Sequence, residues 1–350
     1  MRAARIIKPK EPFAIENVNT PKPKGSQVLV KVQSTGVCHS DIHLWEGGYA
    51  GPPGVFMKVE DRGVKFPLTP GHETAGTVES LGEDVEGFKV GDKVLVYPWV
   101  GDGICPACRV GEENLCDKPR SIGIFQDGGY AEYVLVPNYR YLVDIHGQNA
   151  DEVAYLPCSG LTAYSTIKNA KAQPGEFLVI VGAGGLGLMG IQLAKALTNT
   201  TTIVLDLDDK RLEEAKKLGA DHVINSKTKD SVKEIKELTN GLGADVVIDF
   251  VNASQTAATC INILRKRGRL ILVGLYGGSM ELNLALMPLR AFKIIGSYTG
   301  KYADLVELVE LVEKKVVKSI VSKKFQLDEA NDALNQLKEG KIMGRAVISQ

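Results

Sequence analysis

The sequence has no excess of charge of either sign, few cysteines and no long apolar run. Its 350 residues include 42 basic and 42 acidic side chains, so no overall field attracts nucleic acid or an anionic membrane. No apolar run approaches the ~18 residues of a membrane helix, and Arg2 and Arg5 precede no signal-like stretch. Six cysteines are too few for a disulfide scaffold. We expect a cytoplasmic protein that binds neither nucleic acid nor membrane.

The first part of the chain has a mostly β pattern. Short runs of alternating apolar residues are interrupted by glycine and proline, which is typical of a barrel-like domain whose loops carry function. These predicted strands are Gln27–Val32, Glu73–Glu79, Lys93–Tyr97 and Glu132–Pro137. The stretch Gly47–Pro67 lacks periodic apolar residues, so we expect a long surface loop there.

After about Pro174, apolar runs alternate with helical patterns, which predicts a parallel sheet covered on both faces. Six such strands fit a doubly wound α/β sheet. The predicted strands are Phe177–Val181, Thr201–Asp206, His222–Ile224, Ala244–Phe250, Arg269–Gly274 and Phe292–Gly296. The predicted helices are Leu186–Leu197, Lys210–Leu218, Asp230–Leu238 and Ala257–Leu264, with Asp304–Glu313, Leu327–Leu337 and a strand at Arg345–Ile348 in the tail.

A glycine motif indicates dinucleotide binding in this second part. Gly182, Gly184 and Gly187 form G-x-G-x-x-G between a predicted strand and a predicted helix, where the helix N-terminus can receive phosphate. The next strand ends at Asp206, nineteen residues after Gly187, where a carboxylate accepts from ribose hydroxyls and repels a 2′-phosphate. We therefore expect NAD rather than NADP, with Asp208 as the alternative acid.

Two groups of residues have the composition of zinc sites. Cys105, Cys108 and Cys116 lie close in sequence, and Asp102 precedes the Cys-x2-Cys turn by three residues, which predicts a structural site. Glu112 and Glu113 are alternative fourth ligands. Cys38, His72 and Cys158 are dispersed along the chain and supply two thiolates and one imidazole, a set that zinc accepts in a catalytic site with one open position.

Together these motifs resemble the zinc-dependent alcohol dehydrogenases of the medium-chain dehydrogenase/reductase family. The shared motifs are V-C-H-S-D at 37–41, G-H-E at 71–73, the cysteine segment at 102–116, G-G-Y-A-E-Y at 128–133 and the glycine motif. An acidic fourth ligand in the cysteine segment is similar to the archaeal branch, although that branch usually has Glu where this chain has Asp102. The resemblance implies a GroES-like catalytic domain at 1–157, a Rossmann domain at 158–296 and a returning C-terminal segment at 297–350.

The resemblance also implies individual roles. Cys38, His72 and Cys158 would bind the catalytic zinc, with Glu73 either a fourth ligand in some states or a neighbour of the metal. Ser40 and His43 would relay the alcohol proton through the nicotinamide ribose. The implied cofactor-binding residues are His39, Thr162, Gly182, Gly184, Gly185, Leu186, Gly187, Asp206, Lys210 and Arg345. Trp45 and Trp99 either line the substrate pocket or serve ordinary packing.

The expected activity is reversible oxidation of primary or secondary alcohols to aldehydes or ketones. Zinc acts as a Lewis acid that acidifies the bound alcohol, and the resulting alkoxide transfers a hydride to NAD. A polyol dehydrogenase, or another zinc-dependent medium-chain reductase, is the first alternative, and a non-catalytic NAD-binding protein is a second. The family implies a homodimer or homotetramer, with the segment near Phe292–Gly296 as the edge that joins copies.

Overall fold

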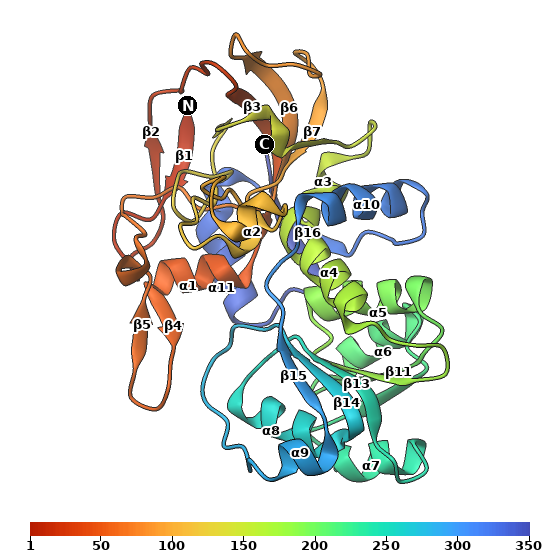
Figure 1. Cartoon of the computed structure of the whole chain (residues 1–350). Helices are drawn as coiled ribbons and strands as arrows, with labels where there is room; N and C mark the ends of the chain where they lie inside the picture. The colour runs from red at the N-terminus through yellow and green to blue at the C-terminus, as the bar shows by residue number, and fades with distance from the viewer.

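The computed structural model describes all 350 residues and shows two parts joined side by side. A β-rich part holds both chain termini, and a second part holds a parallel sheet with helices on its faces (Figure 1). None of the helices combines the length and the apolarity that crossing a bilayer would require.

The β-rich part is built on a seven-stranded sheet. Its strands are β3 (Val28–Val37), β6 (Thr74–Leu81), β7 (Lys93–Val96), β8 (Tyr133–Val136), β9 (Leu142–Asp144), β16 (Val321–Phe325) and β17 (Arg345–Ser349). They follow the order β16-β17-β3-β6-β7-β9, and β8 also pairs with β3. Strand β3 is buried along most of its length, and Lys31 is its one exposed residue, so both of its faces are largely covered. The C-terminal strand therefore completes a sheet that the N-terminal half begins.

The second part contains six parallel strands in the order β12-β11-β10-β13-β14-β15. The strands are β10 (Phe177–Val181), β11 (Thr201–Asp206), β12 (His222–Asn225), β13 (Ala244–Asp249), β14 (Leu264–Leu272) and β15 (Lys293–Gly296). The connecting helices are α5 (Gly185–Leu197), α6 (Asp209–Lys217), α7 (Ser231–Leu238), α8 (Ser254–Ile263) and α9 (Leu286–Arg290). The order reverses between β10 and β13, and ligands of such sheets bind at the carboxyl ends of the strands there.

The predicted doubly wound α/β sheet is confirmed, and β10 and β11 have the predicted bounds. The expected loop at Gly47–Pro67 is wrong in part, because it contains the hairpin β4 (Gly48–Ala50) and β5 (Phe56–Lys58) and the turn η1 (Glu60–Arg62). Two helices beside the site were not predicted, α1 (His39–Glu46) and α4 (Leu161–Ala170).

The remaining elements are short or lie in the tail. They are β1 (Arg2–Arg5), β2 (Ala14–Asn17), α2 (Pro106–Arg109), η2 (Glu113–Leu115), η3 (Tyr139–Tyr141), α3 (Ala150–Val153), η4 (Leu156–Gly160), α10 (Tyr302–Glu313), η5 (Leu327–Glu329) and α11 (Ala330–Lys338). The largest apolar core includes Val28 of β3, Leu161 of α4 and Ile180 of β10, so it continues from one part into the other.

Candidate metal centres and nucleotide-binding turn

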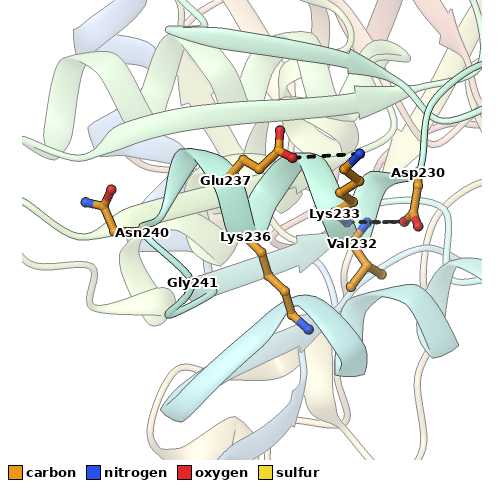
Figure 2. Close-up of a pocket in the computed structure, with 7 residues that line it drawn as sticks. All are labelled: Asp230, Val232, Lys233, Lys236, Glu237, Asn240 and Gly241. Atoms are coloured by element: carbon orange, nitrogen blue, oxygen red, sulfur yellow. Dashed lines mark hydrogen bonds and ion pairs between the residues drawn. The ribbon is translucent and has the colours of Figure 1, made fainter.

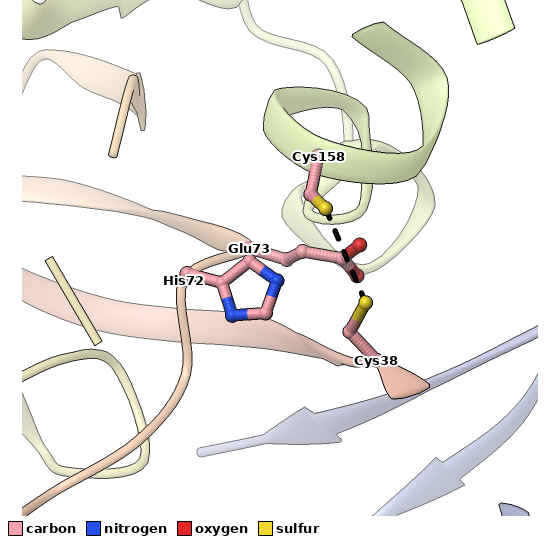
Figure 3. Close-up of side chains that lie close together, drawn as sticks. All are labelled: Cys38, His72, Glu73 and Cys158. Carbon is pink, nitrogen blue, oxygen red and sulfur yellow. Dashed lines mark hydrogen bonds between the residues drawn. The ribbon is translucent and has the colours of Figure 1, made fainter. Parts of the chain in front are cut away.

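Four potential metal ligands from separate segments meet in one buried cluster. Cys38 lies between β3 and α1, His72 and Glu73 precede β6, and Cys158 lies in the short helix η4. One ligand atom from each of the four lies within 4.8 Å of the others, and the sulfurs of Cys38 and Cys158 are 4.0 Å apart (Figure 3). We refer to these four residues as the buried cluster.

The geometry of the buried cluster fits zinc. Two thiolates on a tetrahedral zinc, each about 2.3 Å from the metal, lie about 3.8 Å apart, close to the 4.0 Å between Cys38 and Cys158. Both ring nitrogens of His72 are buried and form no hydrogen bond, although Nδ1 lies 3.4 Å from the Asp41 carboxylate. Buried polar atoms of this kind cost free energy unless a ligand or partner satisfies them. A metal bound to one of these nitrogens would supply that partner.

Asp41 contacts two residues of the buried cluster, and the sequence analysis gave it no role of its own. Its Oδ1 lies 3.4 Å from Nδ1 of His72, and its Oδ2 accepts hydrogen bonds from the Cys38 amide at 2.9 Å and the Tyr130 hydroxyl at 3.0 Å. The carboxylate therefore holds two candidate ligands from one side, as partners of metal-binding histidines do. Its position three residues after Cys38 at the start of a helix was the available signal.

Glu73 and Arg345 form a buried ion pair beside the cluster. The exposed fractions of the two side chains are 0% and 3%, and the guanidinium contacts Glu73 Oε2, while Oε1 accepts from the Ser159 amide at 3.2 Å. Burial raises the pKa of Glu73 to about 7, and the charge of Arg345 opposes that rise. Both carboxylate oxygens thus have protein partners.

Arg345 also contacts the glycine turn. A Cβ built on Gly185 would lie 2.5 Å from Arg345 Cδ, so the arginine stem runs directly against that turn. The residue predicted to contact the cofactor therefore lies between the glycine turn and the buried cluster, with its head engaged by Glu73.

The other residues implied near the reaction lie on α1 and α4, the helices that follow Cys38 and η4 in the chain. Ser40 and His43 are partly buried in α1, and Thr162 is buried in α4, four residues after Cys158. Burial lowers the pKa of His43. His39 keeps part of its surface exposed, and the loss of water around its ring lowers its pKa.

The glycine turn has the close backbone approach that its sequence predicts. Gly182 has φ 93°, and a Cβ on Gly187 would lie 1.8 Å from the Gly182 carbonyl oxygen, so no other residue fits there. At the end of β11, Asp206 accepts a hydrogen bond from the Ala183 amide at 2.7 Å. The carboxylate is therefore fixed beside the turn.

The two candidate acids have different structural tasks. Asp208 accepts from the amides of Lys210 and Arg211 at 2.8 and 3.2 Å, as the N-cap of α6. Asp206, at the strand end, is the acid that adjoins the glycine turn. Lys210 is exposed in the first turn of α6, and Leu186 is partly buried in the first turn of α5.

The cysteine segment 102–116 forms a second cluster, which we call the cysteine lobe. One ligand atom from each of Asp102, Cys105, Cys108 and Cys116 lies within 4.8 Å of the others. The sulfur of Cys105 lies 3.4 Å from that of Cys108 and 3.8 Å from that of Cys116. Backbone amides donate to the sulfurs of Cys105 and Cys116 at 3.4 and 3.2 Å, which favours thiolates that bind metal. Hydrogen bonds from the Cys105 and Ile104 amides lower the pKa of Asp102.

The alternative acids for the lobe have other partners. Glu113 accepts from the Gly101 amide at 3.1 Å and pairs with Arg140 at 2.8 Å, while Glu112 pairs with Lys301 at 3.4 Å. Asp102 is therefore the acid that the structure groups with the three cysteines.

The two tryptophans differ in their surroundings. The Trp45 ring donates a hydrogen bond to the Glu11 carbonyl at 2.7 Å and lies 4.7 Å from the ammonium of Lys338. Trp45 therefore packs against the end of α11. The Trp99 ring lies 5.8 Å from that of His72. Trp99 thus adjoins the buried cluster, and Trp45 packs against another element.

A surface hollow over α7 contains none of the predicted site residues (Figure 2). Its lining includes Asp230, which caps the helix through the amides of Val232 and Lys233, and an ion pair between Lys233 and Glu237 at 4.0 Å. These groups satisfy one another, so the hollow offers little for a ligand.

Comparisons with known proteins agree across the whole chain. Residues 24–147 match the family model described as an alcohol dehydrogenase GroES-like domain, and residues 185–314 match that of a zinc-binding dehydrogenase. Proteins named NAD-dependent alcohol dehydrogenase are 45% identical in Sulfurisphaera tokodaii and 43% identical in Saccharolobus solfataricus, over 99% of each chain. The crystal structure of an alcohol dehydrogenase from Aeropyrum pernix, 38% identical, covers 100% of both chains with a TM-score of 0.92.

Proposed function

The chain belongs to the zinc-binding alcohol dehydrogenase family, and we propose which of its residues bind the zinc and NAD and move the proton when an alcohol is oxidised. It is an oxidoreductase, a zinc- and NAD-dependent alcohol dehydrogenase that interconverts alcohols with aldehydes or ketones. The observation that carries the assignment of residues is the meeting of Cys38, His72 and Cys158 beside the glycine turn.

Cys38, His72 and Cys158 hold the catalytic zinc in this proposal. When bound, zinc supplies Lewis-acid activation of the hydroxyl and NAD accepts the hydride. Asp41 fixes the His72 ring and the Cys38 backbone, so the ligands are preorganised. Glu73 acts as a neighbour of the metal rather than a ligand in this state, because Arg345 and the Ser159 amide engage its oxygens.

Ser40 and His43 move the proton. The Ser40 hydroxyl lies two residues after Cys38 on α1, and we assign it the hydroxyl proton of the substrate. His43 lies one helical turn further on and releases that proton to solvent. Its lowered pKa keeps the imidazole neutral, and therefore able to accept, over more of the acidic range.

The glycine turn and the elements around it bind NAD. Asp206 binds the adenosine ribose and disfavours a 2′-phosphate. His39 and Arg345 face the pyrophosphate, and Thr162 lies beside the nicotinamide. The remaining residues that we assign to cofactor binding are Gly182, Gly184, Gly185, Leu186, Gly187 and Lys210.

The cysteine lobe holds a second, structural zinc through Asp102 and its three cysteines. No ligand position is left open there, which is typical of a structural site. The ligands of the lobe are less buried than those of the buried cluster.

Three coarser features complete the proposal. We divide the chain into a catalytic domain at 1–157, a nucleotide domain at 158–296 and a returning segment at 297–350. All six cysteines are free, which suits a reducing cytoplasm. Strand β15 ends the parallel sheet, so edge-to-edge pairing there would join copies into a dimer or tetramer.

Metal analysis combined with one variant tests the assignment. We expect two zincs per chain in the purified protein, and one in Cys38→Ala, which should lose alcohol oxidation while NAD binding stays nearly unchanged. Cys260→Ala, at a buried cysteine of the nucleotide domain, is the matched control and should keep both zincs. Retained turnover in Cys38→Ala would refute the ligand assignment.

A further inference from the structure

Two rows of aromatic rings begin at histidines assigned to the reaction, one at His72 of the buried cluster and one at His43. In the first row, the rings of His72 and Trp99 lie 5.8 Å apart, and those of Trp99 and Tyr298 lie 5.7 Å apart. In the second row, the rings of His43 and Tyr49 lie 4.5 Å apart. The first row ends at Tyr298, which follows β15, and the second row ends at Tyr49 in β4. We call these two rows the aromatic walls.

Arg62 lies at the outer end of the second row. Its guanidinium carbon lies 5.9 Å from the centre of the Tyr49 ring. Burial raises the pKa of both Tyr49 and Tyr298, and the positive charge of Arg62 opposes the rise in both. The charge of Arg62 therefore acts on both walls.

The guanidinium of Arg62 has no anionic partner in the structure. It takes part in none of the ion pairs within 4.0 Å, although Glu60 and Asp61 precede it in the same turn. Other exposed arginines do pair, such as Arg140 with Glu113 at 2.8 Å. Apart from its interaction with the Tyr49 side chain, Arg62 thus has donors available to a ligand beside the aromatic walls.

We propose that Arg62 binds a carboxylate of the substrate, so that the enzyme favours alcohols in which an aromatic ring separates the carbinol carbon from a carboxylate. The inference rests on the proposed function, since the carbinol end must lie at the buried cluster. A guanidinium presents a planar fork of donors that matches a carboxylate with two hydrogen bonds. Aromatic walls accept the flat spacer between the two ends.

The test compares two substrates that differ in charge and little in shape. We would measure kcat/KM with NAD for 4-(hydroxymethyl)benzoate and for the neutral 4-(hydroxymethyl)benzamide. In Arg62→Leu the acid-to-amide ratio should fall about tenfold, the loss of one charged hydrogen-bonded contact, and mainly through KM. Lys65→Leu removes a charge three residues away without a ring contact and should leave the ratio within about twofold, since exposed charges are screened.

The outcomes separate this inference from the proposed function. An unchanged ratio in Arg62→Leu, or an equal fall in Lys65→Leu, would overturn the carboxylate site while alcohol oxidation stands. Absence of turnover with every alcohol would instead contradict the proposed function. Calorimetric binding of 4-(hydroxymethyl)benzoate to the enzyme with NADH, a pair that cannot react, needs no turnover. It should weaken about tenfold in Arg62→Leu, and unchanged binding would again overturn the site.

Discussion

Asp41 Oδ1 lies 3.4 Å from His72 Nδ1, and both side chains are fully excluded from solvent. A buried carboxylate in this position fixes the orientation of the ring, so that the other nitrogen, Nε2, can face the sulfurs of the buried cluster. The carboxylate also accepts from the Cys38 amide and from Tyr130, which sets the position of the carboxylate itself. The ligand geometry therefore depends on a residue that binds no metal.

Replacing this carboxylate by its neutral isostere should weaken the site without removing a ligand. In Asp41→Asn we expect a loss of about 10- to 100-fold in zinc affinity or in kcat/KM. Elemental analysis after dialysis against a chelator measures how much zinc each variant retains and so tests the expected loss of affinity. Asp230→Asn is the control, because asparagine also caps helices well, and α7 contains none of the site residues. Equal zinc retention in both variants would show that Asp41 has no orienting role.

The buried pair of Glu73 and Arg345 predicts a large single-variant effect. Arg345→Met leaves the Glu73 carboxylate buried without its cation, which should lower the free energy of unfolding by about 3–5 kcal/mol. Adding Glu73→Gln removes the uncompensated charge, so the double variant should recover much of that loss. Urea unfolding of the zinc-loaded proteins measures both. If the double variant is no more stable than Arg345→Met, the ion pair is not the cause.

The pH dependence of turnover tests His43. Burial lowers the pKa of its imidazole, so the neutral, proton-accepting form persists below the usual titration range of histidine. Without it, protons must leave directly to water, which is hardest at low pH. His43→Ala should therefore reduce kcat most on the acidic side, and added imidazole buffer should restore part of it. The hypothesis fails if the pH–rate profile keeps its shape.

Cofactor preference tests the roles of Asp206, the last residue of β11, and of Asp208, which follows it. Asp206→Asn keeps an oxygen that can accept from the Ala183 amide but removes the charge that repels a 2′-phosphate. The ratio of kcat/KM for NADP to that for NAD should rise at least about tenfold, roughly the value of one charged contact. Asp208→Asn keeps a good N-cap for α6 and should leave the ratio unchanged. If this ratio rose more in Asp208→Asn than in Asp206→Asn, Asp208 would be the acid that binds the ribose.

Regular patterns predicted the nucleotide domain well. The strand Phe177–Val181 is buried on both faces of a parallel sheet, so it is a continuous apolar run with clear ends. The glycine motif is equally local, because each glycine is required by backbone within a few residues, as at Gly187. These features need no knowledge of the rest of the fold.

Features that depend on long-range contacts were not predicted. Helix α1 has only eight residues and is largely polar, and its start is set by the hydrogen bond from the Cys38 amide to Asp41. The β4–β5 hairpin has an exposed Phe56 and Met57 rather than an alternating buried pattern. The contact of Arg345 with Glu73 joins residues 272 positions apart, a distance over which sequence spacing carries no information.

The return of the chain to the first sheet has a consequence for building chimaeras. Because β17 pairs with β3, Glu73 and Arg345 both belong to the β-rich part, while Gly185 belongs to the part inserted between them. If the nucleotide-binding part were replaced by that of a relative, the host protein would keep its ion pair between Glu73 and Arg345. The transplanted part would also have to present glycine at position 185, since any Cβ there would lie 2.5 Å from the arginine stem.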